Sequence, residues 1–83
     1  MNVYLVIAGE RGEGGNVNEV YLTKKKALDH GKKLAQKFAK DYMATIEKIN
    51  DPCDSHLKPN GSIVATWYIA CDYVIVERRK VIQ

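Results

Sequence analysis

The sequence predicts a single α+β domain over residues 1–83, in which an antiparallel sheet of three or four strands carries one long amphipathic helix on one face. Short apolar runs rich in β-branched and aromatic residues, which favour strands, lie on both sides of one long segment. In that segment the apolar residues recur every three or four positions, as they do along the buried face of a helix. The expected element order is therefore ββαβ or ββαββ, and 83 residues leave no room for a second domain.

The first segment predicts a β-hairpin. Residues 3–8 read Val-Tyr-Leu-Val-Ile-Ala, a short apolar run typical of a buried strand. Residues 9–15 contain four glycines and favour a loop. Residues 18–22 place Val20 and Leu22 on one face of a second strand, which we expect to pair antiparallel with the first. The glycines match neither a dinucleotide fingerprint nor a P-loop, so we interpret this segment as a hairpin loop.

The next segment predicts the helix. Thr23 is suited to be its N-cap, because a threonine hydroxyl can accept a hydrogen bond from one of the first helical amides. Proline disfavours helical geometry in the residue before it, so Asp51-Pro52 should end the helix, which we expect to run from Lys24 to Asn50. The expected buried stripe consists of Ala27, Leu28, Gly31, Leu34, Ala35, Phe38, Ala39, Tyr42, Met43 and Ile46.

The C-terminal third predicts a loop over residues 51–61 followed by strand-like segments at 62–70 and 73–82. Between these segments, Ala70-Cys71-Asp72 lacks the glycine or proline expected of a tight turn. Two paired strands and one bent strand therefore both remain open.

Composition sets broad limits on location and partners. A net charge of +3 permits a nucleic-acid partner without requiring one. No apolar run approaches the roughly 18 residues that cross a bilayer, so no membrane segment is expected. Cys53 and Cys71 fit free thiols in a reducing compartment, and the expected location is the cytoplasm. A disulfide between them remains the alternative.

Nothing in the sequence predicts a catalytic residue, a metal or a cofactor, and we expect a protein that is not an enzyme. Cys53 and His56, with Asp51 and Asp54, form a cluster of potential metal ligands. A structural zinc site needs four ligands, usually in two spaced pairs, and this single Cys-x-x-His has only the distant Cys71 and His30 to complete it. A polar loop is the simpler interpretation. Cys71 is expected to be a small core residue, because it is flanked by apolar residues.

The remaining histidine and the aromatic residues also have structural interpretations. His30 is expected at the edge of the core on the helix. Trp67, Tyr68 and Tyr73 are expected to pack in the core, with an exposed stacking platform for nucleic-acid bases as the alternative.

Basic residues provide the candidate binding surface. Lys24, Lys25 and Lys26 occupy the expected first helical turn, where the helix dipole disfavours cations, and such local conflicts sometimes mark function. Four further helix lysines extend this candidate surface: Lys32, Lys33, Lys37 and Lys40. A solvated helix face is the competing explanation. Arg78, Arg79 and Lys80 are interpreted as charges that protect an edge strand from unwanted pairing.

The chain resembles a class of short uncharacterised proteins of bacteriophages and bacteria with a strand-strand-helix-strand order. The resemblance rests on Val3-Tyr-Leu-Val-Ile, the Gly-rich loop, Val20-Tyr-Leu-Thr23, Ala27 in a Lys-rich helix and Tyr73-Val-Ile-Val-Glu77. It implies an accessory protein that binds a host protein or counters a host defence, and it assigns no site residue.

We therefore expect a small non-enzymatic protein-interaction module that binds another protein or its own copy through the helix surface or a sheet edge. The alternative is a small nucleic-acid-binding protein that uses the lysine face of the helix. Salt separates the two hypotheses, because nucleic-acid binding depends on counterion release and weakens steeply with salt.

Overall fold

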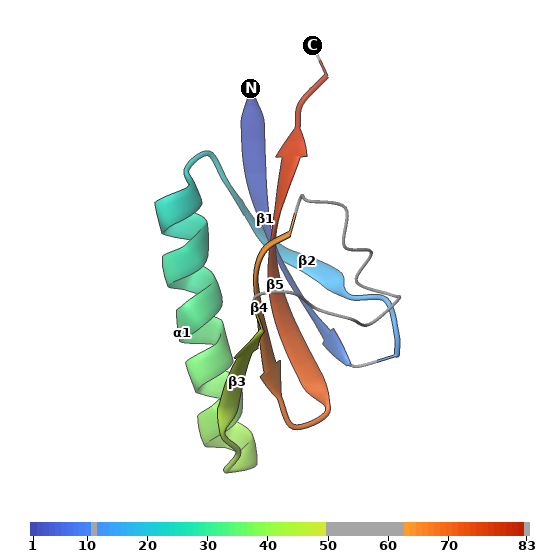
Figure 1. Ribbon diagram of the computed structural model, residues 1–83, viewed down its shortest axis with the longest axis vertical. Helices are drawn as coiled ribbons and strands as arrows, with labels where there is room; N and C mark the ends of the chain where they lie inside the picture. The colour runs from blue at the N-terminus through green and yellow to red at the C-terminus, as the bar shows by residue number, and fades with distance from the viewer. Residues whose placement is uncertain (11, 50–62, 83) are drawn as a thin grey trace.

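The computed structural model describes residues 1–10, 12–49 and 63–82, and it confirms the α+β class. One helix packs on a five-stranded antiparallel sheet with the strand order β2-β1-β5-β4-β3 (Figure 1). The elements are β1 (Asn2–Glu10), β2 (Asn16–Tyr21), α1 (Lys24–Tyr42), β3 (Ile46–Ile49), β4 (Ile63–Ile69) and β5 (Asp72–Lys80). None of the helical structure in these ranges is long and apolar enough to cross a membrane.

The expected N-terminal hairpin is confirmed, since β1 and β2 pair antiparallel. The register contains an irregularity: Val6 pairs with Glu19 and Ile7 with Val17, so Asn18 falls between the pairs. A bulge of this kind redirects a side chain. The Asn18 Oδ1 atom lies 2.6 Å from His30 Nε2 on α1, so the bulge ties the outer strand of the sheet to the helix.

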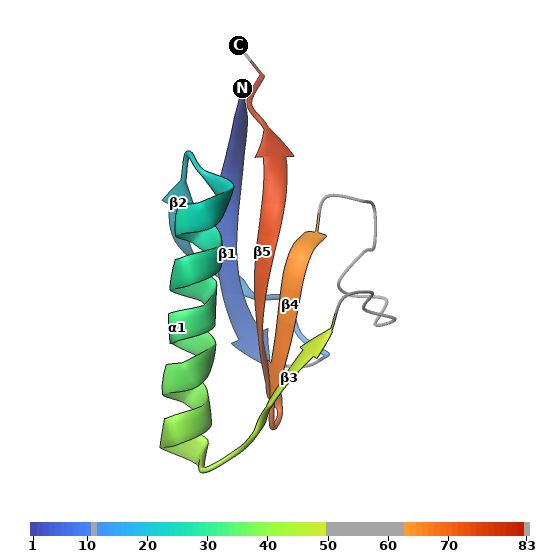
Figure 2. The ribbon, with the colours of Figure 1, turned by 60° about the vertical axis from the view of Figure 1, so that its left-hand side comes forward.

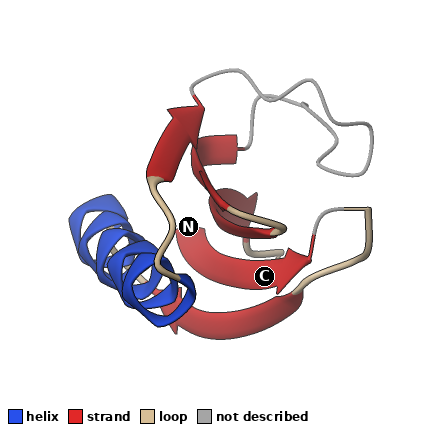
Figure 3. Cartoon of the chain, turned by 90° about the horizontal axis from the view of Figure 1, so that it is seen from below, coloured by secondary structure: helices blue, strands red, loops and turns tan. Residues whose placement is uncertain are grey.

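The main core lies between α1 and one face of the sheet. Ala27, Gly31 and Ala35 are buried along one line of the helix, as the apolar spacing predicts. Opposite them lie Val76 and Trp67, and a Cβ atom added at Gly31 would lie only 2.9 Å from Trp67 Cζ3. The small residues of α1 therefore let the helix approach the sheet closely. Figure 3, viewed from below, shows α1 on one side of the curved sheet.

The helix is shorter than expected. It ends at Tyr42, because Met43 adopts a left-handed conformation with φ 52°. The amides of Met43 and Ala44 donate to the carbonyls of Lys40 and Ala39, which is the pairing of a Schellman motif. The expectation of a helix reaching Asn50 was therefore wrong. Ile46 instead belongs to β3, an edge strand that brings the sheet to five strands where three or four were expected.

The second face of the sheet is also apolar. Tyr68, Tyr73 and Ile75 form a buried cluster there, against which Ile7 and Ile63 pack. The Tyr73 hydroxyl donates to the carbonyl of Glu13 at 3.0 Å, which anchors the hairpin loop. Burial of Trp67, Tyr68 and Tyr73 confirms that these aromatics pack in the core.

Residues 63–80 form two strands, which resolves the alternative left open by the sequence. Ile69 pairs with Asp72, so Ala70 and Cys71 form a two-residue hairpin turn. Ala70 takes the left-handed conformation, with φ 53°, that such turns usually assign to glycine or asparagine. The turn was hidden in the sequence because alanine has no turn signature.

Candidate binding surface

The topology gathers basic side chains from two distant segments at one end of the molecule. Tyr4 of β1 pairs with Tyr21 on one side and with Arg78 on the other. The chain reaches Lys24 and Lys25 three and four residues after Tyr21, so the start of α1 and the end of β5 lie at the same end of the molecule (Figures 1 and 2). We call this group, all of whose side chains are exposed, the basic end: Lys24, Lys25, Arg78, Arg79 and Lys80.

The basic end changes the interpretation of the last three of these residues. Arg78–Lys80 were expected to protect an edge strand, but β5 is the middle strand of the sheet, between β1 and β4. The edge-strand explanation is therefore wrong. Within this group Arg79 forms an ion pair, in which its Nε lies 3.2 Å from Glu77 Oε2.

The start of α1 is built as the sequence predicts. Thr23 is the N-cap, and its hydroxyl accepts a hydrogen bond from the Lys26 amide at 3.3 Å. The first turn contains no acidic residue. Positive charge near a helix N-terminus is unfavourable by about 0.3–1 kcal/mol per residue. Lys24 and Lys25 thus lower the stability of the helix locally, and helix formation does not explain their presence.

A second group of lysines follows the outer surface of α1. Lys26, Lys33, Lys37 and Lys40 are separated by seven, four and three residues, so they lie within about 60° of one another around the helix and span about 21 Å along it. All four are exposed and lie opposite the buried line of Ala27, Gly31 and Ala35. We call this group the lysine ridge. Lys32, also expected in the binding surface, is exposed on the flank of the helix.

Three carboxylates lie at the opposite end of the molecule, where Lys40 of the lysine ridge also lies. Glu10 and Asp72 are directly opposite each other at the far ends of β1 and β5, and Asp41 lies in the last turn of α1. Strands of nine residues separate this end from the basic end by about 27 Å. We call Glu10, Asp41 and Asp72 the acidic end. This group could not be predicted from the sequence, because its members lie far apart along the chain.

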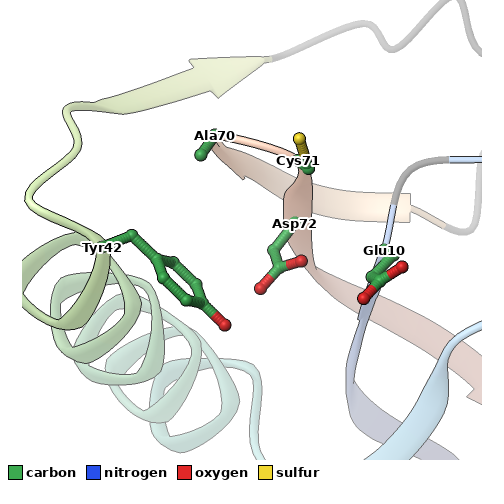
Figure 4. A pocket seen from close by; sticks show the side chains of 5 residues that line it. All are labelled: Glu10, Tyr42, Ala70, Cys71 and Asp72. Carbon is green, nitrogen blue, oxygen red and sulfur yellow. The ribbon is translucent and has the colours of Figure 1, made fainter.

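A shallow, open depression of 270 Å³ lies at the acidic end. It is lined by Glu10, Tyr42, Ala70, Cys71 and Asp72 (Figure 4). The Tyr42 hydroxyl points toward the Asp72 carboxylate, whereas the Cys71 thiol points away from it. The hydrogen bond to Asp72 and the negative charges of Asp72, Asp41 and Glu10 raise the pKa of Tyr42 above its usual value. Tyr42 therefore stays neutral beside these carboxylates.

Cys71 and His30 lie in different parts of the fold. Cys71 is a free, exposed thiol in the β4–β5 turn, so the expectation of a core residue was wrong. His30 contacts Asn18 and the ring of Tyr21, with ring centroids 5.7 Å apart, which places it at the edge of the core as expected. Cys53, with Asp51, Asp54 and His56, lies outside the described residues.

Neither a metal site among the described residues nor a known relative indicates what the candidate surface binds. Among residues 1–10, 12–49 and 63–82, no group of three or more His, Cys, Asp or Glu side chains is placed to hold a metal ion. Comparison with protein-family models, curated proteins and solved structures finds no match for the chain. The separation of charge between the two ends is therefore the feature on which a function can be argued.

Proposed function

We propose that the protein is a small non-enzymatic interaction module that acts in the cytoplasm and binds an acidic surface of another protein through its basic end. The single observation that carries this proposal is that the topology joins Lys24 and Lys25 to Arg78–Lys80, residues more than fifty positions apart. Complementary charge steers association and selects partners.

Apolar side chains beside the basic end favour a protein partner. Leu22, directly before the helix, is 70% exposed, and Val20 on β2 is 49% exposed. Met1 and Ile82 are also exposed, and the amide of Val81 donates to the Met1 carbonyl, which places them side by side. Protein interfaces typically combine apolar contacts at the centre with a polar rim. The resemblance to phage and bacterial accessory proteins makes a host protein the first partner to test.

Two double variants with equal changes in charge test the proposal. K24E/K25E reverses charge at the basic end, and K33E/K40E makes the same change on the lysine ridge. Both pairs are exposed, and glutamate in the first helical turn is favourable, so K24E/K25E should fold. Tagged proteins are used to capture partners from nuclease-treated host lysate at about 150 mM and about 500 mM salt, which differ in Debye length.

A partner that the wild type and K33E/K40E capture in equal amounts, but that K24E/K25E loses, supports the proposal. Equal capture by K24E/K25E and the wild type contradicts it, because the basic end then contributes nothing to binding. Titration of the purified partner against the wild type and each variant then measures how much each variant lowers the affinity.

The lysine ridge supports a second candidate function, binding to the phosphate backbone of nucleic acid. Its four lysines form one line about 21 Å long, and the ridge holds no guanidinium and few groups that could read bases. Sequence-independent binding is therefore expected. Neutralising four phosphates gives a slope of log K against log salt of about −3 to −4.

Fluorescence anisotropy with labelled DNA and RNA tests this second candidate. K33E/K40E should weaken binding at least tenfold and make the salt slope shallower, whereas K24E/K25E should have the smaller effect. Binding that is undetectable at low salt, or equal for K33E/K40E and the wild type, excludes the lysine ridge as a nucleic-acid surface.

A further inference from the structure

The acidic end is the counterpart of the basic end in position and in charge. β1 and β5 pair over their whole lengths, from Asn2 with Lys80 at one end to Glu10 with Asp72 at the other. The helix runs between the same two ends, from Lys24 to Tyr42. The molecule is 42 Å long and 25 × 20 Å across, so each charge group occupies one end of an elongated body.

Both ends also offer apolar contact area. At the acidic end Tyr42 is 54% exposed and Met43 is 95% exposed, beside the shallow depression. At the basic end the exposed side chain of Leu22 precedes Lys24 and Lys25. Tyr42 provides an aromatic face on which a lysine or arginine side chain of a partner can pack.

We propose that the acidic end binds the basic end of a second copy of the chain, so that copies associate head to tail. The occupant is a second copy because the same chain carries both complementary surfaces. Side-by-side association through α1 is disfavoured, because the helix carries seven lysines and two aspartates, and two such helices repel each other. The proposal rests on the proposed function, since it uses the same basic end.

Head-to-tail contacts are heterologous. Every copy that docks its basic end leaves its own acidic end open, so association continues beyond the dimer unless the rotation between copies closes a ring. A second copy and an acidic partner protein compete for the basic end. Self-association therefore withholds the basic end from other partners, and dilution or salt releases it.

Two charge-reversal variants make the test specific. K24E/K25E disables the basic end, and E10K/D41K disables the acidic end. Both should fold, because Glu10 and Asp41 are exposed and lysine in the last helical turn is favourable. Asp72 and its hydrogen bond with Tyr42 stay intact. Circular dichroism melts of each variant confirm folding before association is measured.

Sedimentation equilibrium at low salt is the measurement. The wild-type weight-average mass should rise with concentration beyond twice the 9.4 kDa of the monomer, and should return toward the monomer at about 500 mM salt, where charges are screened. Each variant alone should remain monomeric. An equimolar mixture should form a heterodimer and stop there, because each variant keeps one functional end.

Three outcomes overturn the proposal: a wild type that stays monomeric at all concentrations, a variant that associates alone, or a mixture that stays monomeric while the wild type associates. Failure of the proposed function is separately visible. E10K/D41K should still capture the acidic partner, so loss of self-association with retained capture supports both proposals. Capture unaffected by K24E/K25E overturns the proposed function even when self-association is lost.

Discussion

Replacement of Gly31 by alanine tests the close packing of α1 on the sheet. A Cβ atom at this position would lie 2.9 Å from Trp67 Cζ3 and 3.0 Å from Val76 Cγ2, well inside the usual contact distance of about 3.5–4.0 Å. Alanine gains about 0.8–1 kcal/mol over glycine in a helix interior. Overpacking costs about 1–3 kcal/mol. The net expectation is a loss of about 1 kcal/mol, and a fall in Tm of about 4–8 °C for a domain of this size.

Thermal unfolding followed by circular dichroism measures the effect of G31A. The neighbouring exposed position supplies the control, since K32A and K32G differ in helix propensity without contacting the core. K32A should melt above K32G, whereas G31A should melt below the wild type. A G31A protein whose Tm rises as much as the K32G-to-K32A difference would refute the close contact between α1 and Trp67.

Three further predictions concern the helix end, the second sheet face and pH. M43G should raise the free energy of unfolding by about 0.5–1 kcal/mol, because Met43 is left-handed and its side chain is almost fully exposed. Among the described residues, Thr66 Oγ1 has no hydrogen-bond partner although it is fully buried, so T66V should stabilise by about 1 kcal/mol in urea unfolding. The pKa of Tyr42 is raised in the folded state, first by its hydrogen bond with Asp72. The neutral Tyr42 side chain therefore stabilises the folded protein below the ordinary pKa of 10.0, and this contribution is lost as pH rises through the folded pKa. The stability difference between wild type and Y42F should therefore be greatest near pH 8 and shrink above pH 10.

Each of these predictions has an outcome that contradicts it. A lower Tm for M43G would mean that α1 continues past Tyr42. If T66V were destabilised by more than 1 kcal/mol, the Thr66 hydroxyl of the wild type would have to form a hydrogen bond. A wild-type to Y42F difference that stays constant from pH 8 to pH 11 would remove the coupling between Tyr42 and its carboxylates; the pKa of Tyr73, raised by burial, affects both proteins equally.

The parts of the fold that depend on local patterns were predictable. The Thr23 cap, the line of Ala27, Gly31 and Ala35, and the β1–β2 hairpin all follow from spacing between near neighbours in the chain. The helix end was missed because Met43 adopts a conformation usual for glycine. A residue type that is rare in a left-handed cap gives no signal in the sequence.

The candidate surface was only half predictable. The helix lysines are visible as a run, but Arg78–Lys80 join them only because β5 lies beside β1, and strand order was open from the sequence. The acidic end was missed for the same reason. Glu10, Asp41 and Asp72 come from three elements, and only the antiparallel pairing of β1 with β5 and the direction of α1 bring them to one end.

The most direct test of the central claim, that the basic end is the docking surface, is the affinity of the captured partner for K24E/K25E measured beside K33E/K40E under the same salt conditions. The two variants carry the same net charge and differ only in where the charge was reversed. We predict a loss of at least tenfold for K24E/K25E and little change for K33E/K40E. Equal losses for the two variants would show that binding follows net charge and not the basic end.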